Sequence, residues 1–260
     1  MTQGRPESFI DETAEELVRL YLRLNGYFLL TGYLLHRTAG AGQGLRAEID
    51  ALAVRFPYQR EPLHISPNTA QPNDPQLILP GDTRVVDFVV AEVKAGTSPP
   101  RFNAPLTKRG RGADRNLEDV LSMLGCFVDE VEIKTAAQAI LSQLATPSPE
   151  APATYDLKSG AARVRFLLFW EPGTRRRVNR FFIPLSHVVK IVAERTRPGA
   201  ACETYSRPHA RWRGFPELIL SAMDRASREG RSHESVAALC TDMRRLVQGD
   251  ELLRSRASRG

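Results

Sequence analysis

One segment, residues 84–95, restricts the fold more than any other. Its sequence, RVVDFVVAEVKA, is apolar on both sides of the two-residue period of a strand. Such a strand belongs in the middle of a sheet that is covered on both faces. It ends on Glu92 and Lys94, which project to one face while Val93 turns to the other. Because buried charges are costly unless they are paired or bound, the sequence predicts a polar site at this end of the strand.

Hydrophobic periodicity predicts the elements around this strand. Helical spacing of apolar residues marks a first helix over residues 9–25, with Ser8 as its expected N-cap. Further strands are predicted at residues 27–36, 47–56, 163–170 and 180–184, and further helices at 116–128, 135–144, 215–228 and 233–247. Residues 186–196 fit a helix or a strand, and loops or linkers are expected at 57–82, 96–113 and 146–160. This pattern predicts an α/β protein with a mixed β-sheet flanked by helices.

Charge is distributed unevenly along the 260 residues. Residues 1–160 contain 16 Lys and Arg against 20 Asp and Glu, whereas residues 161–260 contain 20 against 10, so the net charges are −4 and +10. A basic half beside an acidic half favours a polyanionic partner, nucleic acid first. The alternative is a solvated arginine-rich surface, because 31 of the 36 basic residues are Arg. We therefore expect a core over residues 1–145, and a sheet-completing hairpin with a basic, mostly helical extension over 146–260, as one continuous domain or two.

Several classes of protein are excluded by what the sequence lacks. No apolar run reaches the roughly 18 residues of a membrane-spanning helix, and the polar N-terminus does not resemble a signal peptide. The three cysteines form no CxxC pair, which favours a reducing cytoplasm. The histidines lack zinc-hydrolase spacing, and no phosphate-binding loop or acyl-transfer signature is present. The sequence therefore predicts a cytoplasmic protein with no membrane partner.

Asp50 completes the candidate site. It lies in the segment EIDALAV, on the strand that precedes residues 84–95. Neighbouring strands lie roughly 5 Å apart, so pairing of the two strands brings Asp50, Glu92 and Lys94 together. Two carboxylates make an oxygen site of the kind that Mg²⁺ prefers, and Lys94 can act on a nucleophile or on developing negative charge. The alternative is an ordinary ion pair between Glu92 and Lys94 at a strand end.

This arrangement resembles the PD-(D/E)xK nuclease superfamily, in which an opening helix precedes strands that carry an Asp and a (D/E)xK triplet. The resemblance implies a restriction-endonuclease-like core and hydrolysis of phosphodiester bonds, most simply in DNA, in restriction, defence or repair. It implies that Asp50 and Glu92 hold Mg²⁺ or Mn²⁺, that Lys94 acts on the nucleophile or the transition state, and that Glu16 assists. Members of such families often act as homodimers, so a homodimer is compatible with it.

The sequence departs from the family pattern in two ways. Asp50 is not preceded by Pro, and 42 positions separate it from Glu92, which requires an inserted loop. Asp87 begins the same strand as Glu92, but it faces the other way on a regular strand and ranks below Asp50. Glu12 lies one turn before Glu16 on the same helix face, so either can lie at the site.

Basic residues outside this site are the candidate contacts to nucleic acid. They are Lys108, Arg109 and Arg111 after the ExK strand, and Arg175, Arg176 and Arg177 in the turn between two predicted strands. Solvated loops are the alternative for both groups. Gln138 and Gln143 resemble glutamines that some nuclease families place near the substrate. The alternative function for the whole chain is a non-catalytic module that keeps the fold and binds nucleic acid or protein.

Overall fold

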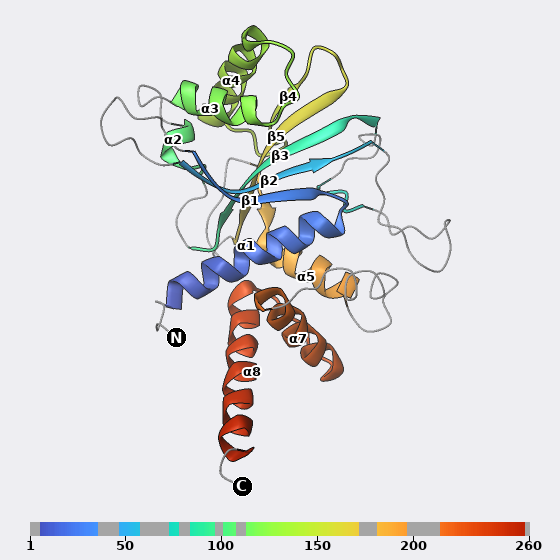
Figure 1. Ribbon diagram of the computed structural model, residues 1–260. Coiled ribbons are helices and arrows are strands. Elements are labelled where there is room, and N and C mark those ends of the chain that lie inside the picture. The colour runs from blue at the N-terminus through green and yellow to red at the C-terminus, as the bar shows by residue number, and fades with distance from the viewer. Residues whose placement is uncertain are drawn as a thin grey trace, which may run out of the picture. The chain divides into compact units, whose positions relative to one another are not determined.

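The structure is a computed structural model, shown in Figure 1. It describes residues 6–35, 47–57, 73–77, 84–96, 101–107, 113–171, 181–196 and 214–257. The chain divides into two compact units. One is helical and is formed from the described residues of Met1–Asn25, Arg60–Asn73 and Pro184–Gly260. The other contains the β-sheet and is formed from those of Gly26–Gln59 and Asp74–Ile183.

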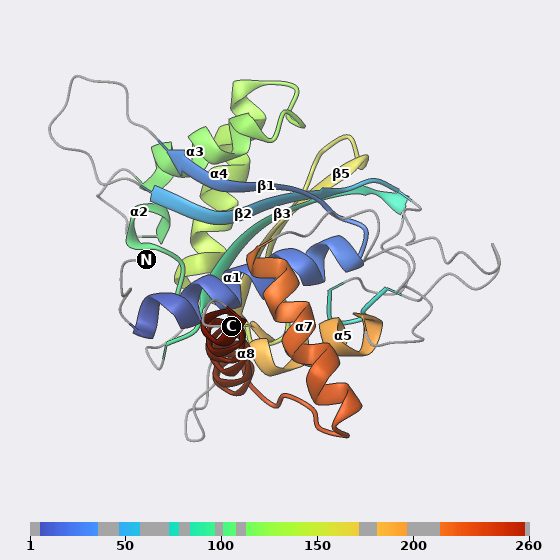
Figure 2. The same cartoon turned by 60° about the horizontal axis from the view of Figure 1, so that its bottom comes forward.

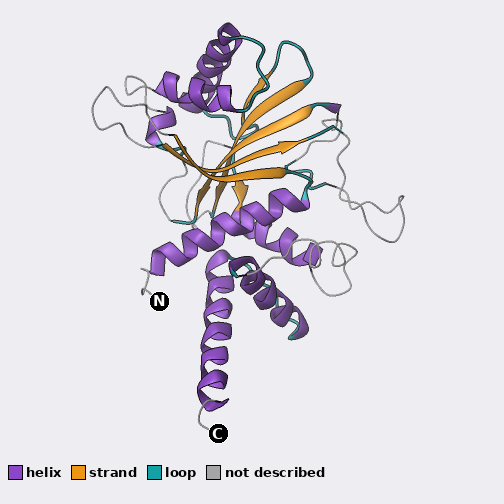
Figure 3. Ribbon diagram, in the orientation of Figure 1, coloured by secondary structure: helices purple, strands orange, loops and turns teal. Residues whose placement is uncertain are grey.

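The strands form one mixed sheet (Figure 3), in the order β1-β2-β3-β5-β4 (Figure 1), with β6 also pairing with β5. β2 runs antiparallel to both of its neighbours, β1 and β3; β5 is parallel to β3, and β4 is antiparallel to β5. The strands are β1 (Phe28–Leu35), β2 (Ala47–Arg55), β3 (Val86–Lys94), β4 (Ala153–Asp156), β5 (Ala162–Trp170) and β6 (Ile183–Pro184). The predicted central position of the ExK strand is confirmed, because β3 has a neighbour on each side.

Three helices cover one face of this sheet (Figures 1 and 2). They are α2 (Ala104–Thr107), α3 (Ala113–Met123) and α4 (Glu130–Ala145). Together with β4 they form the crossover that the parallel step from β3 to β5 requires. Leu117 and Ile140 from the helices pack with Val90, Phe166 and Leu168 from the strands, and all five side chains are buried. This apolar layer fixes the register of β3, because a slip by one residue would turn Val90 out of it.

The helical unit contains α1 (Pro6–Leu24), α5 (Leu185–Thr196), α7 (Phe215–Arg228) and α8 (Val236–Ala257). The rings of Phe9 and Phe215 meet edge to face at 5.5 Å between centroids. Arg195 donates a hydrogen bond to the carbonyl oxygen of Leu24 at the end of α1. In the described part of the chain, no helix combines the length and the apolar character that crossing a membrane requires.

Several local predictions need correction. α1 begins at Pro6, so Ser8 lies inside the helix and is not its N-cap; proline is favourable in a first helical turn because it has no N–H to leave without a partner. The expected linker at 146–160 contains β4, and the expected loop at 96–113 contains α2. Residues 186–196, which fitted two interpretations, are helical in α5.

Gln143 connects α4 to β4. Its side-chain amide donates to the carbonyl oxygen of Thr154 at 2.9 Å and accepts from the Thr154 N–H at 2.9 Å. The amide of an α4 side chain thus satisfies the backbone of a short strand that has little hydrophobic pattern of its own. A helix-to-strand contact of this kind is a tertiary feature, and it gives Gln143 a structural role.

We expect Gln143→Ala to lower the free energy of unfolding by about 1–2 kcal/mol, because two neutral hydrogen bonds of about 1 kcal/mol each are lost. The matched control is Gln138→Ala, which removes an exposed glutamine from the same helix and should change the stability by less than about 0.5 kcal/mol. Urea unfolding followed by circular dichroism measures both. Equal losses in the two variants would contradict the structural role.

Candidate active site

Asp50 lies at the point where β2 and β3 separate. The last paired position of these strands is Ala51 opposite Ala91, so the next position sets Asp50 opposite Glu92. There the ladder is replaced by a side-chain hydrogen bond: the N–H of Val93 donates to Oδ2 of Asp50 at 2.6 Å. This N–H belongs to the peptide that joins Glu92 to Val93. The structure therefore places the carboxylate of Asp50 against the ExK triplet, as the sequence predicted for these two strands.

Glu92 and Lys94 form an ion pair at the same end of β3, between Nζ of Lys94 and Oε1 of Glu92. The side chain of Glu92 is 2% exposed, whereas that of Lys94 is 35% exposed. Nζ of Lys94 also lies 3.4 Å from Oδ1 of Asn103, a long hydrogen bond from the residue that precedes α2. The ordinary ion pair considered from the sequence is thus present, and the lysine side chain in it is partly exposed.

The donor set of this site fits a hard divalent cation. Asp50 and Glu92 provide two carboxylates from neighbouring strands, and Mg²⁺ is usually held by one or two carboxylates, with water and substrate phosphate completing its shell. Among the described residues, no group of three or more His, Cys, Asp or Glu side chains is arranged to hold a metal ion.

Glu16 and Glu12 belong to the other compact unit. The carboxylate of Glu16 accepts a hydrogen bond from Arg19 at 3.1 Å on α1, and Glu12 is exposed on the same helix. The pair with Arg19 is the ordinary arrangement of opposite charges three residues apart on a helix. The assisting role of Glu16 stays a prediction.

Asp87 has a structural role, which agrees with its lower rank in the sequence. It forms a two-point ion pair with Arg165 of β5, with Nε of Arg165 2.9 Å from Oδ1, and it accepts a hydrogen bond from the hydroxyl of Tyr27. Arg165 also donates to the carbonyl oxygen of Leu77 at 2.7 Å. Burial, reinforced by the charge of Asp87, raises the pKa of Tyr27 far above its ordinary value, so the tyrosine stays a neutral donor.

Arg55 lies opposite Asp87 in the β2–β3 register and is fully buried. Burial lowers the pKa of this guanidinium from its usual value, while the nearby Asp87 acts in the opposite direction. Two arginines and one aspartate are therefore gathered inside the sheet unit, near the beginning of β3. The candidate active site lies at the other end of the same strand, five to seven positions further along.

The predicted contacts to nucleic acid lie outside the described residues. This holds for Lys108, Arg109 and Arg111 as well as for Arg175, Arg176 and Arg177, so their role stays a prediction.

Many arginines of α7, α8 and the turn between them have carboxylate partners. These ion pairs are Arg225–Glu229, Arg228–Asp224, Arg231–Glu229, Arg231–Asp242 and Arg245–Asp242. Such pairs reduce the positive potential that this part of the chain offers to a polyanion.

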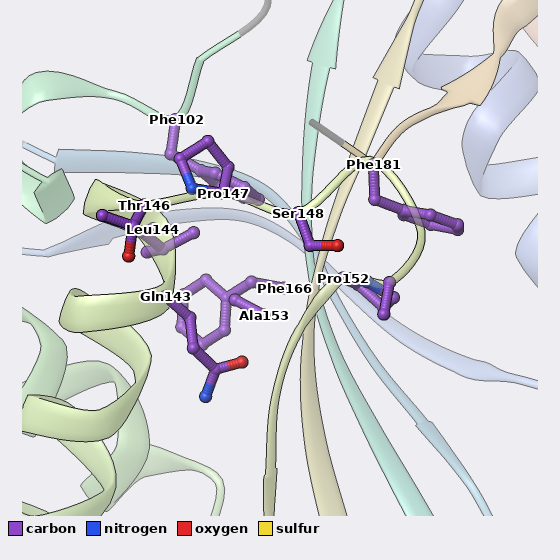
Figure 4. A pocket seen from close by; sticks show the side chains of 11 residues that line it. Phe102, Gln143, Leu144, Thr146, Pro147, Ser148, Pro152, Ala153, Phe166 and Phe181 are labelled. Atoms are coloured by element: carbon purple, nitrogen blue, oxygen red, sulfur yellow. The ribbon is translucent and has the colours of Figure 1, made fainter. Parts of the chain in front are cut away.

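A cavity of about 120 Å³ lies on the face of the sheet that α2, α3 and α4 cover (Figure 4). Phe102, Phe166 and Phe181 line it together with the residues that follow α4. Small-molecule sites usually enclose about 300–1,000 Å³, so this space is too small for a typical ligand. The cavity therefore does not compete with the end of β3 as the candidate site.

Sequence reasoning missed two residues that shape the site. Asn103 lies in a stretch that was expected to be a loop, and its only sequence signal was that Asn is a common residue just before a helix. Trp170 is buried in the core, and it donates from its indole N–H to the carbonyl oxygen of Gly96 at 3.1 Å. This bond fixes the chain just after Lys94, because Trp170 is the register partner of Lys94 on β5.

Comparison with protein-family models, with curated proteins and with solved structures finds no match.

Proposed function

We propose that this chain is a Mg²⁺- or Mn²⁺-dependent phosphodiesterase that hydrolyses nucleic acid, in the first instance as a DNA endonuclease with a restriction-endonuclease-like core. One observation carries the proposal. The carboxylate of Asp50 accepts a hydrogen bond from the N–H of the peptide between Glu92 and Val93, and the ammonium of Lys94 forms an ion pair with Glu92. The sequence motif is thus matched by a contact in space between its two separated parts.

The position of the site in the sheet supports the same proposal. β3 and β5 are parallel, and Glu92 and Lys94 lie at the carboxyl end of β3. In open α/β sheets, ligands bind outside the carboxyl ends of the strands. The order of elements also agrees with the resemblance, because α1 precedes the strands that carry Asp50 and the ExK triplet.

Hydrolysis of a phosphodiester adds water across a P–O bond. The oxygen of water bonds to phosphorus, the bond to one sugar oxygen breaks, and that oxygen leaves with a proton. Mg²⁺ bound by Asp50 and Glu92 would lower the pKa of a coordinated water and would offset the negative charge on the phosphate.

Lys94 supplies a positive charge, which the two carboxylates cannot. Its ammonium contacts Glu92 and Asn103, and the side chain as a whole is 35% exposed, so Lys94 can face a substrate phosphate. A fixed positive charge beside the phosphorus stabilises the extra negative charge of the transition state.

The experiment is cleavage of supercoiled plasmid and of duplex, branched and single-stranded DNA and RNA, with Mg²⁺, Mn²⁺ or EDTA. We expect metal-dependent cleavage by the wild-type chain and a loss of at least about a hundredfold in Lys94→Ala and in Glu92→Gln, the scale found when one transition-state contact is removed. The matched control is Lys134→Ala, which removes an exposed lysine of α4 in the same unit and should leave the rate unchanged.

The outcomes separate the alternatives. Equal cleavage by the wild type and by both site variants would show that the activity comes from elsewhere. Absence of cleavage on every substrate, together with salt-sensitive nucleic-acid binding that survives Lys94→Ala, would favour the non-catalytic binding module.

A further inference from the structure

The cavity of about 120 Å³ beside β5 has an aromatic lining. Phe102 and Phe166 form its inner part: both side chains are buried, and their rings meet edge to face at 5.8 Å between centroids. The half-buried Phe181 lines it from the segment before β6 (Figure 4). The N–H of Phe181 donates to the carbonyl oxygen of Ser148 at 2.6 Å, which connects this wall to the chain after α4. Three segments that are distant in the sequence thus build one cavity.

The rim of the cavity carries hydroxyl groups. Thr146 and Ser148 line it, and both are exposed. The oxygen of Ser148 accepts a hydrogen bond from the N–H of Glu150 at 3.1 Å, which leaves the hydroxyl proton to donate to a ligand. The hydroxyl of Thr146 donates to the carbonyl oxygen of Ser142 at 2.9 Å, which leaves its oxygen to accept. The cavity therefore suits a group that is apolar over its faces and polar at its edge.

The cavity lies on the same face of the sheet as the candidate active site. Phe166 is the register partner of Val90, and Glu92 follows Val90 by two residues, so these side chains share a face. Two residues along a strand span roughly 7 Å, and one step across the sheet spans roughly 5 Å. Phe102 directly precedes the asparagine that contacts Lys94. The cavity is thus within reach of a nucleotide whose phosphate lies at the candidate site.

We infer that the cavity binds one unpaired pyrimidine base of the nucleic-acid strand that is cleaved, an inference that rests on the proposed phosphodiesterase function. Bases stack on aromatic side chains, and a pyrimidine carries oxygen and nitrogen atoms at its edge for the hydroxyl groups of the rim. Size agrees as well. An apolar cavity of about 150 Å³ can hold a benzene ring, so an open one of about 120 Å³ suits one six-membered ring better than the two rings of a purine.

This binding mode selects the substrate. In a duplex each base is paired and stacked, and bringing it out of the helix costs free energy that a single strand does not require. The chain should therefore prefer single-stranded or locally unpaired nucleic acid with a pyrimidine beside the cleaved phosphodiester. The metal site alone makes no such distinction, because it contacts only the phosphate.

The experiment is binding of a short, fluorescently labelled pyrimidine strand to the full chain in EDTA, which prevents metal-dependent cleavage. Fluorescence anisotropy compares the strand alone with the strand paired to its complement. We expect the single strand to bind at least about tenfold more tightly than the duplex. Phe181→Ala removes one aromatic wall, and Ala151→Phe fills the cavity that Ala151 lines. Each should weaken single-strand binding by about tenfold or more, the scale of one base–aromatic stack, and leave duplex binding unchanged.

The matched control is Phe56→Ala, which removes a phenylalanine that is 51% exposed in the same unit and does not line the cavity. It should leave binding of both probes unchanged. Ala151 is exposed between α4 and β4, so its variant tests the cavity even if Phe181→Ala fails to fold. Thermal unfolding followed by circular dichroism checks each variant. In cleavage of the single strand with Mg²⁺, we expect Ala151→Phe to raise KM by about tenfold and to keep kcat.

Two results would overturn the inference: equal affinity of the wild type for the single strand and the duplex, or single-strand binding that both cavity variants leave intact. Failure of the phosphodiesterase proposal is distinguishable from either. Cavity-dependent binding without cleavage would contradict that proposal and leave the base site in place. Metal-dependent cleavage together with unchanged binding in both cavity variants would contradict only the base site.

Discussion

Asp87→Ala is expected to lower the free energy of unfolding by about 3–5 kcal/mol, the range for breaking a buried ion pair by removing one partner. The substitution leaves the guanidinium groups of Arg165 and Arg55 inside the sheet unit without their shared counter-charge, and it removes the acceptor of the Tyr27 hydroxyl. Urea unfolding followed by circular dichroism measures the loss. A change below about 1 kcal/mol would show that the charges are solvated and that the buried network is wrong.

The matched control is the ion pair of Arg163, which lies two residues before Arg165 on β5. Arg163 of β5 pairs with Asp156 at 2.6 Å, but the side chain of Asp156 is 66% exposed. Asp156→Ala should therefore cost at most about 1 kcal/mol, since exposed ion pairs contribute little. The double variant Asp87→Leu with Arg165→Met is expected to recover part of the loss, because an apolar pair of similar volume avoids the desolvation of two charges.

Asp50→Asn is expected to reduce metal-dependent cleavage by at least about a hundredfold while leaving the fold intact. The amide oxygen of asparagine can still accept the hydrogen bond from the Val93 N–H, so the local connection between β2 and β3 is kept. What is lost is the negative charge, which makes a carboxylate a stronger ligand for a divalent cation than a neutral amide. Cleavage rates at several Mg²⁺ concentrations, with urea unfolding in parallel, separate the two effects.

Asp50→Ala is the companion variant, because it removes both the charge and the acceptor. We expect it to be as inactive as Asp50→Asn and, in addition, less stable by about 1–2 kcal/mol, the cost of one charge-assisted hydrogen bond at a partly buried site. Full activity in Asp50→Asn would mean that the carboxylate holds no metal and that its role is confined to binding the Val93 N–H.

The candidate site could be predicted because Asp50, Glu92 and Lys94 lie on regular strands. Alternation along residues 84–95 predicts that Glu92 and Lys94 share a face, and the neighbouring strand brings Asp50 within reach. The contact between Asn103 and Lys94 had no such basis. It depends on where α2 begins after a stretch without periodicity, and no local pattern determines that position.

The sequence by itself determined the local features of this protein: an α/β pattern, a central apolar strand that ends in ExK, and a strand at residues 27–36. These follow from side-chain periodicity, which acts over a few residues. Only the tertiary structure decided that β5 runs parallel to β3, that Arg165 neutralises Asp87 across 78 positions, and that Gln143 holds β4. Such contacts join distant segments, and they form only when the packing of the whole core selects which strands become neighbours.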